Sequence, residues 1–133
     1  MGLPLAKQGD QIVATDMHLV LVPAPPGPPV PTPLPHPFTG IINSNLSPNV
    51  KIGGMPAATV GSIADNTPPH IPMPPGTTFV NPPTNKATIT MGSNTVFINK
   101  KPAARMGDMA QSCFDIPGPP ATVVAAGNVM VGG

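Results

Sequence analysis

Few residues in this sequence carry strong metal-ligand chemistry. The 133-residue chain holds three histidines and one cysteine, namely His18, His36, His70 and Cys113. Imidazole nitrogen and thiolate sulfur are donors that zinc prefers, and four of them complete a tetrahedral shell. Taken alone, a histidine in a proline-rich loop is more often a solvated surface residue, and a single cysteine more often a small buried apolar one. The four residues are far apart in sequence, so any shared site must be assembled by the fold.

The elements that must position these side chains form an internal repeat. Residues 50–62, VKIGGMPAATVGS, align without gaps on residues 96–108, VFINKKPAARMGD, at an offset of 46. Each copy has a short run of alternating or β-branched residues, a turn pair, a Pro-Ala-Ala segment and a closing Gly-Ser or Gly-Asp step. A further β run lies upstream of each copy, at 40–42 and 87–90. Each copy therefore predicts a β-hairpin closed through glycine-rich or polar turns.

A third copy is split between the two ends of the chain. Residues 121–133 supply the upstream run and the strand, and residues 4–10, PLAKQGD, supply the closing half. A repeat of this scale indicates units that cannot bury their apolar faces alone. We therefore predict one ring of three like units with an approximate three-fold axis, in which the two termini meet. Coincidence between biased stretches is the alternative, since proline and glycine inflate self-similarity.

Three of the four candidate ligands follow the repeat at comparable distances. His18 and His70 each lie eight residues after the closing residue of a unit, and Cys113 lies five residues after one. Those closing residues are Asp10, Ser62 and Asp108. In a three-fold arrangement, the loops that follow them emerge at one end and converge on the axis, which predicts a metal site. His36 is the candidate for the fourth ligand.

Four protein ligands leave no open position for water, so the predicted ion is structural rather than catalytic. Zinc suits these donors, and iron competes for them. Asp10, Ser62 and Asp108 occupy matched turn positions, where such side chains cap backbone groups. Arg105 stands where the other copies have Thr59 and Lys7, and we expect it to be exposed and replaceable.

The composition predicts an all-β fold. The chain has 23 prolines and 14 glycines but no tryptophan or tyrosine, and prolines this frequent are incompatible with helices. A hydrophobic share of 40% and a net charge of +1 argue against disorder, although a disordered proline-rich linker is a rival interpretation. We predict a single domain over residues 1–133 with Pro/Gly-rich loops, including a long proline-rich loop at residues 23–37.

The same composition narrows the classes of function. Only 8% of the residues are charged and no basic stripe exists, which argues against a nucleic-acid partner. No apolar run approaches the ~20 residues of a membrane span, so we expect no stable membrane insertion. No catalytic triad spacing or phosphate-binding loop is present, and we expect the protein not to be an enzyme. A small metal-storage or metal-sensing protein is the alternative, which predicts an open and exchangeable coordination position.

The repeat resembles that of the PAAR-repeat proteins, named for the tetrapeptide that stands here as Pro102-Ala103-Ala104-Arg105. The copy at 56–59 departs from it at one position and the copy at 4–7 at two. The resemblance covers essentially the whole chain. It implies a small conical β spike with pseudo-three-fold symmetry, which caps and sharpens the trimeric VgrG-type spike of a contractile injection system and helps to puncture the target envelope. Such a system is either type VI secretion or a phage-tail-like extracellular particle.

The resemblance also implies a site and partners. A zinc ion near the apex would be held by three histidines and one cysteine, which by position are His18, His36, His70 and Cys113; His36 lies outside the repeat registration. The partners would be one trimeric VgrG-like spike per cap, effector cargo in some systems and, transiently, the target cell envelope. The protein would be in the bacterial cytoplasm during assembly and then exported or extracellular at the particle tip. The split unit occupies both ends, so we expect no toxin or adaptor extension.

Three short strands are expected to form the base that binds the spike. Alternation along each strand gives one face to the core of the cap and the other to the partner. The residues are Val50, Lys51, Ile52, Val96, Phe97, Ile98, Val129, Met130 and Val131.

Overall fold

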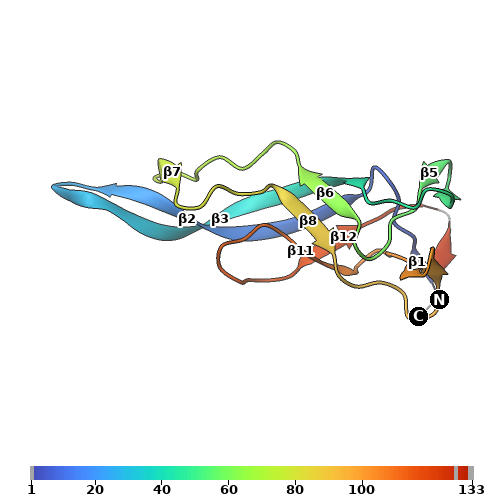
Figure 1. The fold of residues 1–133 in the computed structure, drawn as a ribbon. Coiled ribbons are helices and arrows are strands. Elements are labelled where there is room, and N and C mark those ends of the chain that lie inside the picture. Colours follow the sequence, from blue (N-terminus) through green and yellow to red (C-terminus); the bar gives the residue numbers. More distant parts are fainter. Residues whose placement is uncertain (1, 128, 132–133) are drawn as a thin grey trace.

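The computed structural model describes residues 2–127 and 129–131, and its regular elements within those ranges are all β-strands (Figure 1). The all-β prediction is confirmed. No helix in the described ranges is long and apolar enough to cross a membrane. In chain order the strands are β1 (Leu3–Pro4), β2 (Gln11–Ala24), β3 (Gly27–Ser44), β4 (Lys51–Ile52), β5 (Met55–Pro56), β6 (Ile63–Asn66), β7 (Thr78–Phe79), β8 (Lys86–Ile89), β9 (Phe97–Ile98), β10 (Lys101–Pro102), β11 (Met109–Gln111), β12 (Ala121–Val124) and β13 (Met130–Val131).

A closed ring of three backbone hydrogen bonds marks the pseudo-three-fold axis. The Ala6 N–H donates to the Ala104 carbonyl at 2.9 Å, Ala104 to Ala58 at 3.1 Å, and Ala58 to Ala6 at 3.0 Å. All three alanines are 0% exposed, because three chain segments converge on them. Interiors are close-packed, so a side chain larger than methyl has no room at this point. The repeated alanine therefore marks the axis, and the predicted arrangement of three units is confirmed.

The glycine that follows each of these segments has a left-handed backbone. Gly9, Gly61 and Gly107 have φ values of +93°, +96° and +87°, a region that residues with a Cβ rarely adopt. Each glycine N–H donates to the carbonyl of a large-sheet strand, at 3.0, 2.9 and 2.9 Å. The accepting residues are Ile42, Ile89 and Val123. Glycine thus lets the chain turn from the ring into the large sheet in every unit.

The closing Asp or Ser of each unit accepts a backbone hydrogen bond from the residue three positions earlier. The distances are 3.0 Å to Asp10, 2.9 Å to Ser62 and 2.7 Å to Asp108, so the predicted capping role is confirmed. The expectation for Arg105 is wrong. Its side chain is largely buried, and it donates to the Asp108 carboxylate at 2.8 and 3.1 Å and to the Gly92 carbonyl at 3.3 Å.

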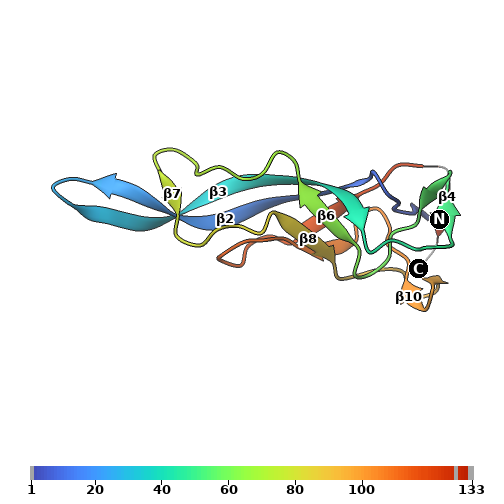
Figure 2. The same ribbon diagram turned by 45° about the horizontal axis from the view of Figure 1, so that its top comes forward.

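Three two-stranded sheets lie together at one end of the molecule; two are hairpins, and the third, formed by the two chain ends, is counted with them as a hairpin below (Figures 1 and 2). They are the pairs β4–β5, β9–β10 and β1–β13. In the last pair, Leu3 lies opposite Val131 and Pro4 opposite Met130, so the two ends of the chain meet as predicted. A small apolar cluster packs beneath the hairpins, formed by Leu5, Ile52, Ala57, Ile98 and Ala103. The side chain of Val131 lies outside the described part of the structure.

The large sheet closes on itself above this base. Its strand order is β12-β11-β8-β6-β3-β2, and β12 also pairs with β2 at Gln11–Val13. Further along the same edge of β2, β7 pairs with Val20 and Leu21. The enclosed core combines the ring alanines with larger side chains. The largest of these are Ile12, Phe38, Ile42, Ile89 and Val123.

The hairpin of β2 and β3 runs far beyond the other strands and forms the point of the molecule (Figures 1 and 2). The two strands pair from Gln11 opposite Ile41 to Ala24 opposite Gly27. The prediction of a loop at residues 23–37 is therefore wrong, since most of this segment belongs to β3. A strand tolerates proline where the missing N–H would point away from its partner.

Candidate metal centre

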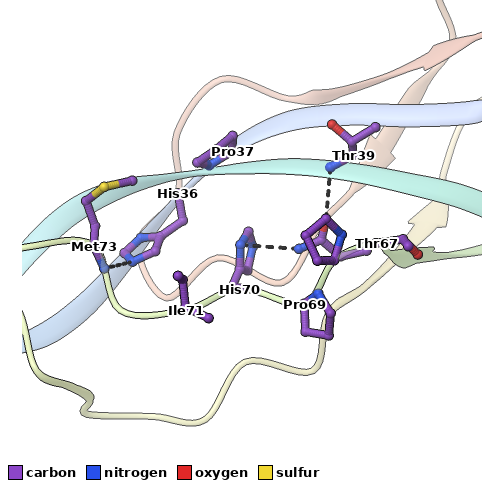
Figure 3. A pocket seen from close by; sticks show the side chains of 10 residues that line it. His36, Pro37, Thr39, Thr67, Pro69, His70, Ile71 and Met73 are labelled. Atoms are coloured by element: carbon purple, nitrogen blue, oxygen red, sulfur yellow. Dashed lines mark hydrogen bonds between the residues drawn. The ribbon is translucent and has the colours of Figure 1, made fainter.

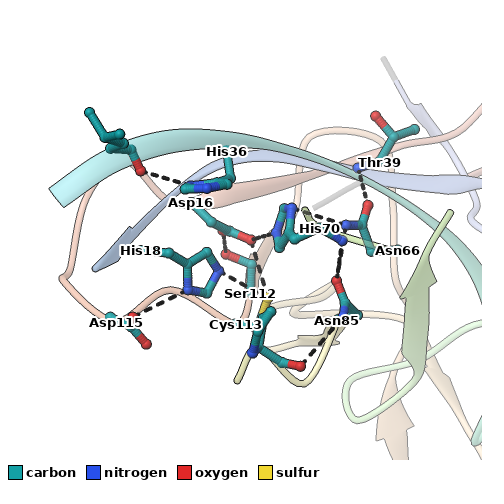
Figure 4. A network of polar contacts seen from close by, with 12 residues as sticks. Asp16, His18, His36, Thr39, Asn66, His70, Asn85, Ser112, Cys113 and Asp115 are labelled. Atoms are coloured by element: carbon teal, nitrogen blue, oxygen red, sulfur yellow. Dashed lines mark hydrogen bonds and ion pairs between the residues drawn. The ribbon is translucent and has the colours of Figure 1, made fainter. Parts of the chain in front are cut away.

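Three of the four predicted ligands lie together where the long hairpin leaves the body of the molecule (Figure 4). His18 is on β2, His70 follows β6, and Cys113 follows β11, so each comes from a different unit of the repeat. With Asp16 they form a group whose ligand atoms all lie within 4.8 Å of one another. Matched positions in the repeat thus converge on one point, as the three-fold argument requires.

Asp16 is the member of the group that sequence reasoning missed. It is 0% exposed and takes its contacts from all sides (Figure 4). Its Oδ2 atom lies 2.9 Å from His70 Nε2 and accepts from the Cys113 thiol at 3.3 Å, while the Ser112 hydroxyl donates to Oδ1. The available signal was its spacing: Asp16 precedes His18 by two residues on one strand, so both side chains share a face.

His36 lies beside the group but outside it. Its ring centroid is 5.4 Å from that of His18 and 5.6 Å from that of His70. Nδ1 donates to the Leu34 carbonyl at 2.8 Å, and Nε2 accepts from the Met73 N–H at 3.0 Å (Figure 3). Coordination through Nε2 would require that the Met73 hydrogen bond be given up. The role of His36 as a ligand stays a prediction, and Asp16 offers the fourth donor in this geometry.

The position of the site along the molecule differs from the expected apex. His18 pairs with Leu34, and the hairpin continues for six further residues on β2 to Ala24. At about 3.3 Å per residue, the point projects roughly 20 Å beyond the group. The site therefore lies at the base of the projecting part of the hairpin, called its root below, and not at its tip.

Burial favours the neutral, ligand-competent form of His18 and His36. It lowers the pKa of His18 and of His36. The Nδ1 atom of His18 lies 3.4 Å from Asp115 Oδ2 without hydrogen-bond geometry, and it is a buried polar atom with no hydrogen-bond partner. A carboxylate beyond the second nitrogen is the arrangement that orients a metal-bound imidazole. His18 is thus built to present Nε2 to the group.

The pKa values of the two acidic side chains in the group, Cys113 and Asp16, are shifted in opposite directions. Burial, followed by the charge of Asp16, raises the pKa of the Cys113 thiol to about 12. Burial also acts to raise the pKa of Asp16, but hydrogen bonds from His70, Ser112 and Cys113 outweigh it and lower the pKa overall. A cation would offset the burial of a carboxylate and a thiolate side by side.

The donor set fits a metal ion. Two imidazoles, a thiolate and a carboxylate are all zinc ligands, and a tetrahedral shell with bonds near 2.1 Å separates its ligand atoms by about 3.5 Å. The observed spread of up to 4.8 Å needs only small side-chain movements to reach that geometry. A pocket of about 260 Å³ lies beside His36 and His70, and His70 is the member of the ligand group that lines it (Figure 3).

Neighbouring side chains hold the two loops in place. The His70 N–H donates to Asn85 Oδ1 at 2.8 Å, and the Asn66 amide lies 3.2 Å from His70 Nδ1. The Phe79 ring packs with its centroid 5.5 Å from that of His18 and 5.3 Å from that of His36. The ligand group is therefore enclosed by β7 and the segment before β8.

Comparison with known proteins agrees with the repeat. Among curated proteins, none matches the chain. A family model described as PAAR motif matches residues 33–113 and 81–133, which together cover most of the sequence. With its three-fold ring and this match, the chain belongs to the PAAR motif family, whose members serve as spike tips in contractile injection and type VI secretion systems.

Proposed function

We propose that this chain caps the end of a trimeric VgrG-type spike, with one cap for each trimer. The observation that carries the proposal is the closed ring through Ala6, Ala58 and Ala104. One chain thereby presents three like hairpins around an axis, and a three-fold partner can engage all three at once. Capping also covers the strand edges at the end of such a spike, which would otherwise invite aggregation.

The base has the composition of a docking surface. Six large apolar side chains are exposed there, with Phe97 at 57% and Met130 at 54%. The six are Leu3, Val50, Met55, Phe97, Val129 and Met130. Exposed apolar patches with a polar rim mark interaction sites.

The rim of this surface is basic. Lys51, Lys100 and Lys101 are exposed and make no ion pair with a described carboxylate. The five aspartates all have partners elsewhere: Lys7, Lys86 and Arg105 each pair with one, and the other two lie beside His18 and His70. The partner surface should therefore be apolar at its centre and acidic at its edge.

The opposite end suits entry into a target envelope. The long hairpin supplies a single narrow point, and the ligand group ties its root to the loops of the other two units. The bound ion is proposed to be zinc in a structural role, and the protein to act without enzymatic activity. We propose that it is assembled in the bacterial cytoplasm, carries cargo in some systems, and acts at the tip of the exported or extracellular particle.

The test is to mix the purified chain with the trimeric spike protein of its own system and to measure the mass of the complex by light scattering. We expect one cap for three spike chains, and a Phe97→Asp variant should fail to bind while remaining folded. A ratio of one to one would contradict the symmetry argument. Metal analysis should find one zinc per chain, whereas an exchangeable ion with an open coordination position would favour metal storage or sensing.

A further inference from the structure

Prolines alternate along β3 with a strict period of two. They occupy positions 29, 31, 33, 35 and 37, and each lies in the paired part of the long hairpin or next to it. Proline has no N–H, and in a strand it is confined to positions where no ladder hydrogen bond is needed. The question is which way these five positions face.

The outer contacts of β2 give the answer. The carbonyls of Met17, Leu19 and Leu21 accept from Asp115, Val80 and Thr77 respectively, each at 2.9 Å, so these β2 residues point away from β3. Directly opposed residues of an antiparallel pair direct their backbone groups the same way, both inward or both outward. The residues opposite are Pro35, Pro33 and Pro31. The odd-numbered positions of β3 therefore face its outer edge.

The backbone donors along that edge can be counted completely. Prolines 29 to 37 contribute none. The next outward N–H, that of Thr39, donates to Asn66 Oδ1 at 2.9 Å, and from Gly40 onward β3 pairs with β6. Over residues 29–37 the outer edge thus offers carbonyl acceptors and no N–H donor.

The other edge of the hairpin is covered as far as Leu21. Strand β7 pairs with β2 at Val20 and Leu21, and the Leu19 N–H donates to the Asp115 carboxylate at 3.0 Å. Opposite Pro31, Pro33 and Pro35, the β3 edge is therefore the open edge of the hairpin. Beyond Leu21, no described strand pairs with the outer edge of β2 either. An open, apolar edge strand is ordinarily a template for pairing with another chain.

Charge does not protect this edge. Residues 17–50 contain no Asp, Glu, Lys or Arg, although charged side chains are a common way to protect an edge strand. Val30 on the same strand is 50% exposed. The alternating prolines are the remaining protection.

We propose that the alternating prolines of β3 close its outer edge to strand addition, by a second copy of this chain or by an extended segment of another protein. An incoming strand needs N–H donors and carbonyl acceptors in alternation along the edge that it joins. The β3 edge has no N–H group to donate to the carbonyls of the incoming strand. The projecting hairpin consequently stays single while exposed. This inference concerns the free hairpin and does not depend on docking to a spike or on the ion.

Restoring edge donors should create the missing interaction. Pro31→Thr/Pro33→Thr and Pro31→Ala/Pro33→Ala each return two N–H groups to the edge. We expect both to form dimers, doubling the mass measured by light scattering at concentrations where the wild type is a monomer. The matched control is Val30→Thr/Leu34→Thr. The backbone groups of these two residues face β2, so the control adds no N–H donor to the outer edge and should stay monomeric.

Three results would overturn the proposal. The first is that both proline variants fold and remain monomers. The second is that only the threonine variant associates, which would point to β-propensity. The third is that the control associates. A further measurement keeps every proline in place. Thr32→Cys should give no more cross-linked dimer with a short bismaleimide than Met91→Cys, an exposed site outside the hairpin, and a clear excess would show that the native edge pairs.

Discussion

The ring at the base and the projecting hairpin solve the same problem of backbone pairing by opposite means. In the ring, each unit repeats the same donors, acceptors and left-handed glycine, so three segments satisfy one another. The hairpin belongs to one unit, and it pairs with itself along one edge while proline removes the donors from the other. Repeated residues therefore build the symmetric part, and unrepeated ones build the single point.

The ligand group lies between these two regions and joins them, so its removal is expected to have the largest effect. Structural zinc contributes on the order of 10 kcal/mol in small domains. His70→Ala/Cys113→Ala should lose the ion and loosen the root of the hairpin, as seen by metal analysis and thermal unfolding. Amide exchange at Ala6, Ala58 and Ala104 should remain slow, because the ring has its own hydrogen bonds. A full complement of zinc in this variant would refute the site.

Ala104→Leu tests the ring itself. The alanine is 0% exposed at the convergence of three segments, and overpacking such a position costs up to about 3 kcal/mol. Ala24→Leu, on the exposed hairpin tip, is the matched control and should leave the free energy of unfolding nearly unchanged. Urea unfolding compares the two, and equal stabilities would mean that the ring is less tightly packed than its geometry indicates.

Gly61→Ala tests the turn that leads out of the ring. At a φ of +96°, a Cβ adds strain of about 1–2 kcal/mol even though no atom lies within 4 Å of its place. Gly118→Ala has equal space and no positive φ, so it should cost much less. If thermal unfolding shows the same loss for both variants, backbone conformation is not what glycine provides there.

Arg105→Ala examines the arginine of the motif, and the free energy of unfolding should fall by about 1 kcal/mol when its ion pair with Asp108 is lost. Lys7→Ala should cost less, because Lys7 is 21% exposed whereas Arg105 is 12% exposed. Chemical denaturation measures both. A larger loss for Lys7→Ala would show that burial does not set the order.

Acid should weaken the hairpin root even in chelator-treated protein. Burial lowers the pKa of His18 and His36 below the ordinary value of 6.5, so below that pH the unfolded chain binds protons that the folded chain refuses. Stability is then complete above pH 6.5 and falls as the pH drops below it. Thermal unfolding near pH 5.5 should occur at a lower temperature than near pH 7.5, because the ordinary histidine pKa lies between them. A higher unfolding temperature in acid would contradict this.

The base was predictable because its constraints are local. Alanine, glycine and an acid or hydroxyl recur at fixed offsets, and each is the residue that its backbone position demands. The convergence of His18, His70 and Cys113 followed from the same registration.

The hairpin was not predictable in the same way. Its prolines resemble a loop by composition, and only their period of two, set against the pairing with β2, shows that they fit a strand. Asp16 was missed because carboxylates were not counted among the ligands, although its spacing from His18 placed both on one face. Arg105 was judged from the residues at matched positions, which do not show how deeply one unit buries its side chain.

The ring made by one polypeptide has a consequence for shape. Three identical chains around an axis would carry three projecting hairpins or none, and three hairpins would crowd one another at the axis. Because the three units belong to one polypeptide, each can have its own sequence. A base with approximate three-fold symmetry can therefore carry a single asymmetric point.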